Sequence, residues 1–203
     1  MPLIRWIVLA LGVLVIAALG ARLATRRAAA PDLPVLGEVP AFALTEAHGD
    51  TLTRDELLGR PWIADFIFTR CAGTCPVMSS SMSGLHDDFL ADHDLSAYRF
   101  VSISVDPDYD TPDVLREYAR LVEADSARWF FLTGDYDAIH ALSQRGFHLG
   151  SGQDADTNEI LHSTKFVLVD RAGKIRGYYD GTVPEEVAQL AKDARAIARE
   201  PAS

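Results

Sequence analysis

The chain has 203 residues, about half of them hydrophobic, which is enough for one domain of ordinary size whose core needs no disulfide. Residues 1–30 contain four arginines and no acid, so residues 31–203 must sum to −14 to give the net charge of −10. Such an acidic domain is not expected to bind nucleic acid or an anionic membrane face. A basic protein surface or a cation suits it better.

The N-terminal segment is predicted to lie in a membrane. Residues 6–21 (WIVLALGVLVIAALGA) are uncharged and mostly apolar, and they stand between Arg5 and Arg22. As a helix they rise about 24 Å, against a hydrocarbon core of about 30 Å, and the arginine stems can extend this reach. We therefore predict an uncleaved signal anchor over residues 1–27, with cleavage after the apolar run as the alternative.

The arginines around this segment give a conflicting indication of orientation. Three arginines follow the apolar run and one precedes it. Read literally, the positive-inside rule would leave the following domain in the cytoplasm. The margin is small, so the chemistry of the cysteines also bears on the orientation.

A linker and then a single domain are predicted after the anchor. Residues 28–40 (AAAPDLPVLGEVP) contain three prolines and no periodicity, which is typical of a linker. Residues 41–203 form the predicted domain. Short apolar runs predict its strands, at 61–68, 99–105, 128–132, 164–170 and 175–179.

Helices are predicted between these strands from their end signals. Thr111 and Pro112 open one helix, Asp135 caps a run that ends at Gly146, and Pro184 opens the last. The acidic stretch 150–159 is predicted to be a loop. Alternation of strands and helices, then a hairpin and a helix, predicts an α/β thioredoxin-like fold with a central mixed sheet flanked by helices, preceded by the N-terminal membrane helix.

The only two cysteines of the chain, Cys71 and Cys75, follow the strand at 61–68. A disulfide between them would close a very small loop, so a purely structural role is disfavoured. Pro76 suits the first turn of a helix, and the start of a helix favours the thiolate form. The pair is therefore predicted to be either a redox couple or two metal ligands.

A metal site would need a further ligand besides the two thiolates. Thiolates favour Cu(I) or zinc, and a histidine is the expected complement. His162 stands directly before the strand at 164–170, which would hold its backbone in place. The other five histidines are interpreted as surface or packed residues: His48, His86, His93, His140 and His148.

Three motifs, in this order, resemble the Sco/SenC family of copper-binding assembly proteins. They are DFIFTRCAGTCP, SISVDPDYDTPDVLREYA and LHSTKFVLVD, and the resemblance covers roughly residues 40–198. It implies a thioredoxin-like fold and a membrane anchor. It also implies a domain outside the bacterial inner membrane, in the periplasm or on the exterior face, or else in the mitochondrial intermembrane space, and a role in maturing the binuclear copper centre of cytochrome c oxidase subunit II.

Carried over residue by residue, the resemblance makes Cys71, Cys75 and His162 copper ligands. It also marks Asp106 as a carboxylate near the site, against the simpler interpretation of a turn residue at a strand end. Asp110 is interpreted as a turn or capping residue, and Met78 and Met82 of the motif helix as core or surface helix residues rather than extra ligands.

The implied function is that of a copper chaperone rather than an enzyme, with reduction of the receiver's cysteines as a related activity. A membrane-tethered thiol-disulfide oxidoreductase acting without metal is the main alternative. A thiol peroxidase and a copper sensor are two further ones.

Overall fold

The computed structural model describes Gly12, residues 33–71, 73–150, 152–153, 160–161 and 163–200, with 152–153 and 160–161 described by their backbone alone. The chain divides into two compact units, Met1–Asp32 and Leu33–Ser203. Apart from Gly12, the predicted membrane segment lies outside the described residues. Within the described part of the chain, no helix is long and apolar enough to cross a membrane.

A mixed eight-stranded sheet forms the centre of the second unit, in the order β1-β10-β9-β4-β5-β6-β2-β3. Strands β4, β5 and β6 are parallel, and the other pairings are antiparallel. Strands β7 and β8 pair separately. The strands are β1 (Gly37–Glu38), β2 (Ala43–Glu46), β3 (Thr51–Thr53), β4 (Trp62–Ile67), β5 (Arg99–Ser104), β6 (Trp129–Thr133), β7 (Gly152–Gln153), β8 (Ile160–Leu161), β9 (Lys165–Val169) and β10 (Lys174–Asp180).

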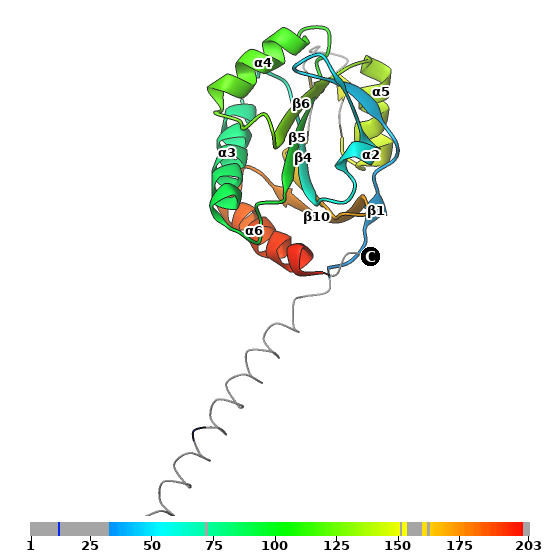
Figure 1. Cartoon of the computed structure of the whole chain (residues 1–203). Coiled ribbons are helices and arrows are strands. Elements are labelled where there is room, and N and C mark those ends of the chain that lie inside the picture. Colours follow the sequence, from blue (N-terminus) through cyan, green and yellow to red (C-terminus); the bar gives the residue numbers. More distant parts are fainter. Residues whose placement is uncertain are drawn as a thin grey trace, which may run out of the picture. The chain divides into compact units, whose positions relative to one another are not determined.

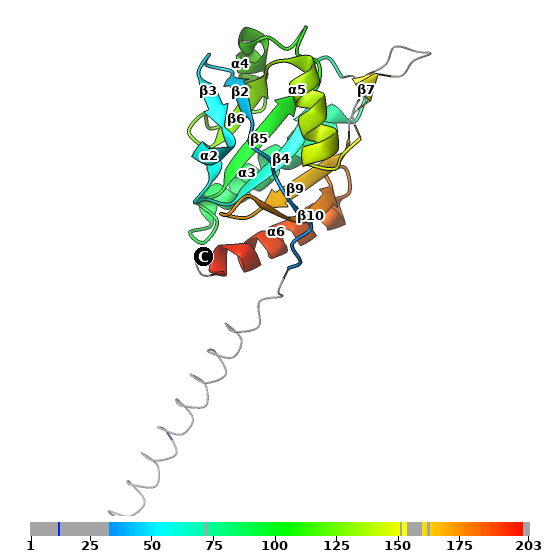
Figure 2. The same ribbon diagram turned by 90° about the vertical axis from the view of Figure 1, so that its right-hand side faces the viewer.

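Helices cover both faces of this sheet (Figures 1 and 2). They are α2 (Arg54–Leu57), α3 (Cys75–Ala91), α4 (Pro112–Leu121), α5 (Tyr136–Ala141), the π-helix η1 (Leu142–Gly146) and α6 (Pro184–Arg199). Helices α3, α4 and α6 contribute to one apolar cluster, and α5 and η1 to the other. The predicted mixed sheet flanked by helices is confirmed.

Strand β4 shows why two layers form. All six of its residues are buried, as expected for a parallel strand covered on both faces. Ile63 and Ile67 pack in the cluster beneath α3, whereas Ala64 and Phe66 pack in the cluster beneath α5. By the two-residue period of a strand, Asp65 lies on the α3 face. Because β4 leads directly into the cysteine loop, the buried sheet fixes where that loop begins.

The predicted helix starts agree with local hydrogen bonds. The side chain of Asp135 accepts a hydrogen bond from the backbone N–H of Ala138 at 2.9 Å, and the side chain of Thr111 caps α4. The helix that begins after Asp135 changes to a π-helix for its last five residues. Strands β1, β2, β3, β7 and β8 and helix α2 were not predicted, and β7 lies inside the stretch 150–159 that was expected to be a loop.

Part of the segment expected to be linker packs on the domain. Residues 37–38 form β1, which pairs with β10, and Val39 is fully buried. The backbone carbonyl of Leu33 accepts hydrogen bonds from Arg176, whose guanidinium also pairs with Asp170 and Glu200. The folded unit thus includes residues from 33 onwards.

Candidate functional site

The two cysteines lie at the junction between β4 and α3. Cys71 is half-buried in the loop, and its backbone N–H donates to the carbonyl of Phe68 at 3.3 Å. Cys75 is the first residue of α3 and is 1% exposed, with Pro76 following in the first turn. The two thiols are not joined by a disulfide, and they lie near enough for Cys71 to influence the pKa of Cys75. Cys71 is thus the more accessible sulfur, with Cys75 directly behind it.

Burial decides the protonation state of Cys75. Burial raises the pKa of the Cys75 thiol far above its ordinary value, and the backbone N–H of Phe68 lowers it by a smaller amount. The neighbouring Cys71 and the carboxyl of Asp65 raise it further. The sequence predicted that the helix start would favour a thiolate, but for Cys75 desolvation outweighs this effect.

Asp106 is linked to the cysteine loop through the residue before Cys71. The Nε of Arg70 donates to Oδ2 of Asp106 at 2.6 Å, and Asp106 is 7% exposed. This hydrogen bond raises the pKa of Arg70, and the guanidinium also lies over the ring of Tyr109, 4.9 Å from its centroid. The ion pair therefore joins the end of β5 to the loop that carries Cys71.

Asp110 has a larger role than the sequence predicted. Its fully buried carboxylate accepts hydrogen bonds from the backbone N–H of Thr69 at 3.1 Å, from Thr69 Oγ1 at 2.5 Å and from Ser104 Oγ at 2.5 Å. It closes the turn at 107–109 through its backbone N–H, which donates to the carbonyl of Asp106 at 2.9 Å, and its side chain fastens the cysteine loop to β5. Nothing in the local sequence distinguishes this from an ordinary strand-end aspartate.

Asp65 is a buried acid that the sequence analysis passed over. It is 1% exposed, and burial raises its pKa from 3.8 to about 7, although Ser102 Oγ donates to it at 2.6 Å. Its electrostatic influence reaches both Cys75 and Tyr118. The available signal was an acid inside an otherwise apolar strand.

The predicted histidine ligand, His162, lies outside the described residues. Among the residues that the structure describes, no group of three or more His, Cys, Asp and Glu side chains could hold a metal ion. Met78 and Met82 are fully buried in the core, which decides between the core and surface positions that the sequence left open. His86 is also buried, between the rings of Phe100 and Trp129.

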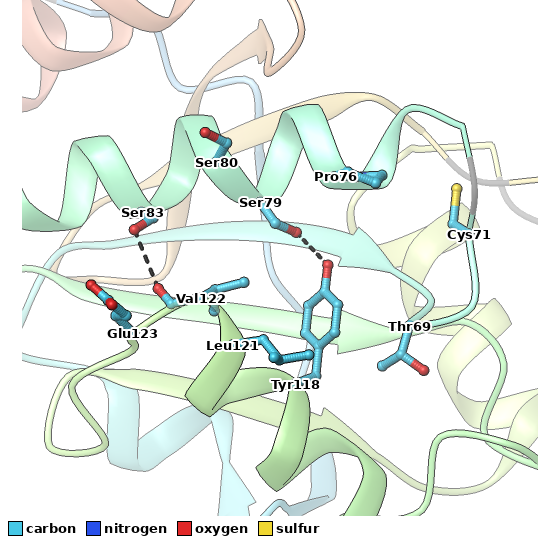
Figure 3. A pocket seen from close by; sticks show the side chains of 10 residues that line it. All are labelled: Thr69, Cys71, Pro76, Ser79, Ser80, Ser83, Tyr118, Leu121, Val122 and Glu123. Carbon is cyan, nitrogen blue, oxygen red and sulfur yellow. Dashed lines mark hydrogen bonds between the residues drawn. The ribbon is translucent and has the colours of Figure 1, made fainter.

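A groove opens beside Cys71, between α3 and the C-terminal end of α4 (Figure 3). Its volume is about 430 Å³. The hydroxyls of Ser79 and Tyr118 lie 2.6 Å apart across it. Ser83 Oγ donates to the carbonyl of Val122 at 3.2 Å. The groove thus forms a concave surface on one side of the Cys71 sulfur.

This fold and this site define a class: a layered α/β protein with a vicinal pair of thiols at the start of a helix. The SCO1/SenC family model matches residues 35–199. The chain belongs to this family.

Individual relatives agree with the family match. The SCO1 protein homolog of Bacillus subtilis is 31% identical over 149 residues, covering 73% of this chain and 76% of the relative. The crystal structure of a SCO1/SenC family lipoprotein from Bacillus anthracis is 30% identical, with a TM-score of 0.75, covering 81% of this chain and 97% of the other.

Two further solved structures describe properties of relatives. One concerns a disulfide switch in BsSco, a member of the Sco family of cytochrome c oxidase assembly proteins. It is 27% identical with a TM-score of 0.68, and covers 80% of this chain and 96% of the other. Bradyrhizobium japonicum ScoI, solved with copper bound, shares the fold at 23% identity, with a TM-score of 0.63 and coverage of 76% and 98%.

Proposed function

We propose that this protein is a membrane-anchored copper chaperone that binds copper through Cys71, Cys75 and His162. It delivers the ion to the binuclear copper site of cytochrome c oxidase subunit II, or reduces the cysteines of that site. In this proposal the segment 1–27 anchors the protein in the bacterial inner membrane, with the domain in the periplasm.

The observation that carries the proposal is the pair of cysteine thiols at the junction between β4 and α3, one half-buried in the loop and one at the first position of the helix. Two thiols four residues apart at a helix start can close on one soft ion, and thiolates favour Cu(I). The relatives reported with bound copper and with a role in oxidase assembly support copper as the cargo.

The burial of Cys75 fits a site that must release its cargo. A buried thiol with a raised pKa holds its proton until a strongly bound cation replaces it, so binding releases protons. Cys71 is the exposed side of the site, and incoming ligands of a receiver can reach the ion there. A three-ligand site leaves a coordination position for such an exchange.

The same pair supports a redox step, which the relative with a disulfide switch favours. The Cys71 thiolate attacks a receiver disulfide and forms a mixed disulfide, releasing one receiver thiolate. The Cys75 thiolate then attacks the Cys71 sulfur and releases the second receiver thiolate. Two electrons pass to the receiver, the two thiol protons end on its sulfurs, and Cys71 and Cys75 become a disulfide.

Copper binding to the reduced fragment 31–203 tests the proposal. The unaltered protein, His162→Ala and Cys71→Ala/Cys75→Ala are compared by stoichiometry and by the sulfur-to-copper charge-transfer absorption of the Cu(II) form. We expect one copper per chain, no binding without the cysteines, and a weakened or spectrally altered site without His162. If thiol and disulfide interconvert while copper binds weakly and His162→Ala changes nothing, the protein is a disulfide reductase.

A further inference from the structure

The groove beside Cys71 extends away from the thiols along α3. Figure 3 shows Cys71 at one end of the lining side chains and Glu123 at the other. The wall from α3 carries hydroxyl groups, including that of the exposed Ser80. The opposite wall carries Leu121, which is 73% exposed. The groove is therefore partly apolar, partly rich in hydrogen-bonding groups, and continuous with the reactive sulfur.

Glu123 is the one residue with an acidic or basic side chain among the described residues that line the groove. Helix α3, which forms one wall, contains no lysine or arginine. The two arginines inside α4, Arg116 and Arg120, form ion pairs with acids of the same helix. Glu123 is exposed, and across the described part of the chain it forms no ion pair. Its carboxylate is thus available to a basic group from outside.

The backbone at Glu123 gives a second reason to look for a role. Its φ is 55°, in the left-handed region, directly after the residue that ends α4. Glycine is the usual residue at this position because it has no Cβ to strain the backbone. A glutamate there lowers stability compared with glycine, so its side chain is the feature that needs explaining.

The length of the groove determines how far apart two residues of a bound peptide must be to reach both of its ends. Pro76 and Ser83, which line it, are seven helical residues apart, or about 10 Å along α3. An extended chain advances about 3.3 Å per residue. If an extended peptide lies in the groove with its cysteine sulfur at Cys71, the residue three or four positions from that cysteine therefore lies beside Glu123.

We propose that this groove binds an extended segment of the receiver that carries a cysteine and, three or four residues away, a lysine or arginine. The cysteine meets Cys71, the intervening backbone lies against the hydroxyl wall, and the basic side chain pairs with Glu123. This inference rests on the proposed function, because it concerns the receiver of copper or electrons.

Synthetic peptides can test the inference without the receiver. Each peptide has one cysteine in a mixed disulfide with 5-thio-2-nitrobenzoate. The Cys71 thiolate attacks the peptide sulfur, a bond between Cys71 and the peptide forms, and thionitrobenzoate leaves with the electron pair of the broken bond and absorbs visible light. One peptide set has Lys three or four residues before or after the cysteine, and the matched set has Glu at the same positions.

The rates are measured with the full chain in detergent, reduced and free of metal, at low ionic strength. We expect the better Lys peptide to react at least tenfold faster than its Glu counterpart. In Glu123→Gly this ratio falls below threefold while the melting temperature stays the same or rises, since glycine suits the left-handed backbone. In Glu123→Lys the preference reverses.

Two controls separate binding in the groove from general effects. Asp137→Lys makes the same charge change on α5, which packs on the other face of the sheet, and should keep the tenfold ratio. Reaction with 2,2′-dithiodipyridine, which is too small to span the groove, should change less than twofold in every variant.

The inference is overturned if the unaltered protein reacts less than threefold faster with the Lys peptide than with the Glu peptide. It is also overturned if the preference for the Lys peptide persists in Glu123→Gly or is lost in Asp137→Lys. Copper stoichiometry is measured on the same preparations. Failure to bind copper with an intact peptide preference would count against the proposed cargo alone. Normal copper binding without a peptide preference would count against the groove alone.

Discussion

The buried carboxyl of Asp65 gives the sharpest test of the energetics of this core. Asp65 lies in β4 beneath α3, 1% exposed, and its described polar contact is the hydroxyl of Ser102. We choose the substitution Asp65→Asn because asparagine has nearly the shape of a protonated aspartate. It keeps an acceptor for Ser102 but cannot become charged.

The magnitude follows from the pKa of this group. Burial raises the pKa of Asp65 from 3.8 to about 7. Between these two values the native protein holds a proton that the unfolded chain has lost, so the free energy of unfolding falls as the pH rises. At about 1.4 kcal/mol per tenfold change in proton affinity, the full loss is about 4 kcal/mol and is complete above pH 7.

Urea unfolding of the reduced fragment 31–203 at pH 4.5, 6 and 8 measures this effect. Relative to the unaltered protein, Asp65→Asn should change stability little at pH 4.5 and raise it by up to about 4 kcal/mol at pH 8. Asp137→Asn, at an exposed position on α5, is the matched control. If the difference between Asp65→Asn and the unaltered protein does not grow with pH, Asp65 is ionised in the folded protein and the reasoning is wrong.

Substitutions at three other positions test the hydrogen bonding and packing of the domain. Asp110→Ala removes a buried acceptor of three hydrogen bonds and should lower the free energy of unfolding by about 3–5 kcal/mol, with a smaller loss for Asp110→Asn. Equal losses would exclude a role for the charge. Gly84→Ala, inside α3 with open space around its Cβ position, should raise stability by about 1 kcal/mol. Gly181→Ala should lower the free energy of unfolding by about 1–3 kcal/mol, because the added Cβ would lie 2.7 Å from the ring of Phe166. Urea unfolding that finds Gly181→Ala more stable than Gly84→Ala would contradict this account.

The groove beside Cys71 relates the fold to the proposed delivery step. Helices α3 and α4 follow the neighbouring parallel strands β4 and β5 and pack on the same face of the sheet. The groove lies between these two helices, next to the loop that connects β4 to α3. A receiver that uses this groove would bring its own ligands to the exposed side of Cys71.

Local signals predicted much of the fold. The capping residues Thr111 and Asp135 and the prolines at helix starts act within one turn, so their effect can be read from neighbouring residues. Apolar runs located the five longest strands for the same reason. The short strands β1, β2 and β3 have few residues and are held by partners distant in sequence, so no local pattern revealed them.

The candidate site divides in a similar way. The sequence by itself determined that Cys71 and Cys75 share one helix start, since their spacing and Pro76 are local facts, and its motifs indicated the family. Only the tertiary structure decided that Cys75 is buried with a raised pKa, that Asp65 lies beneath it, and that Asp110 fastens the cysteine loop. The physical reason is that desolvation and long-range hydrogen bonds depend on which faces of distant segments meet, and a linear pattern of residue types does not contain that information.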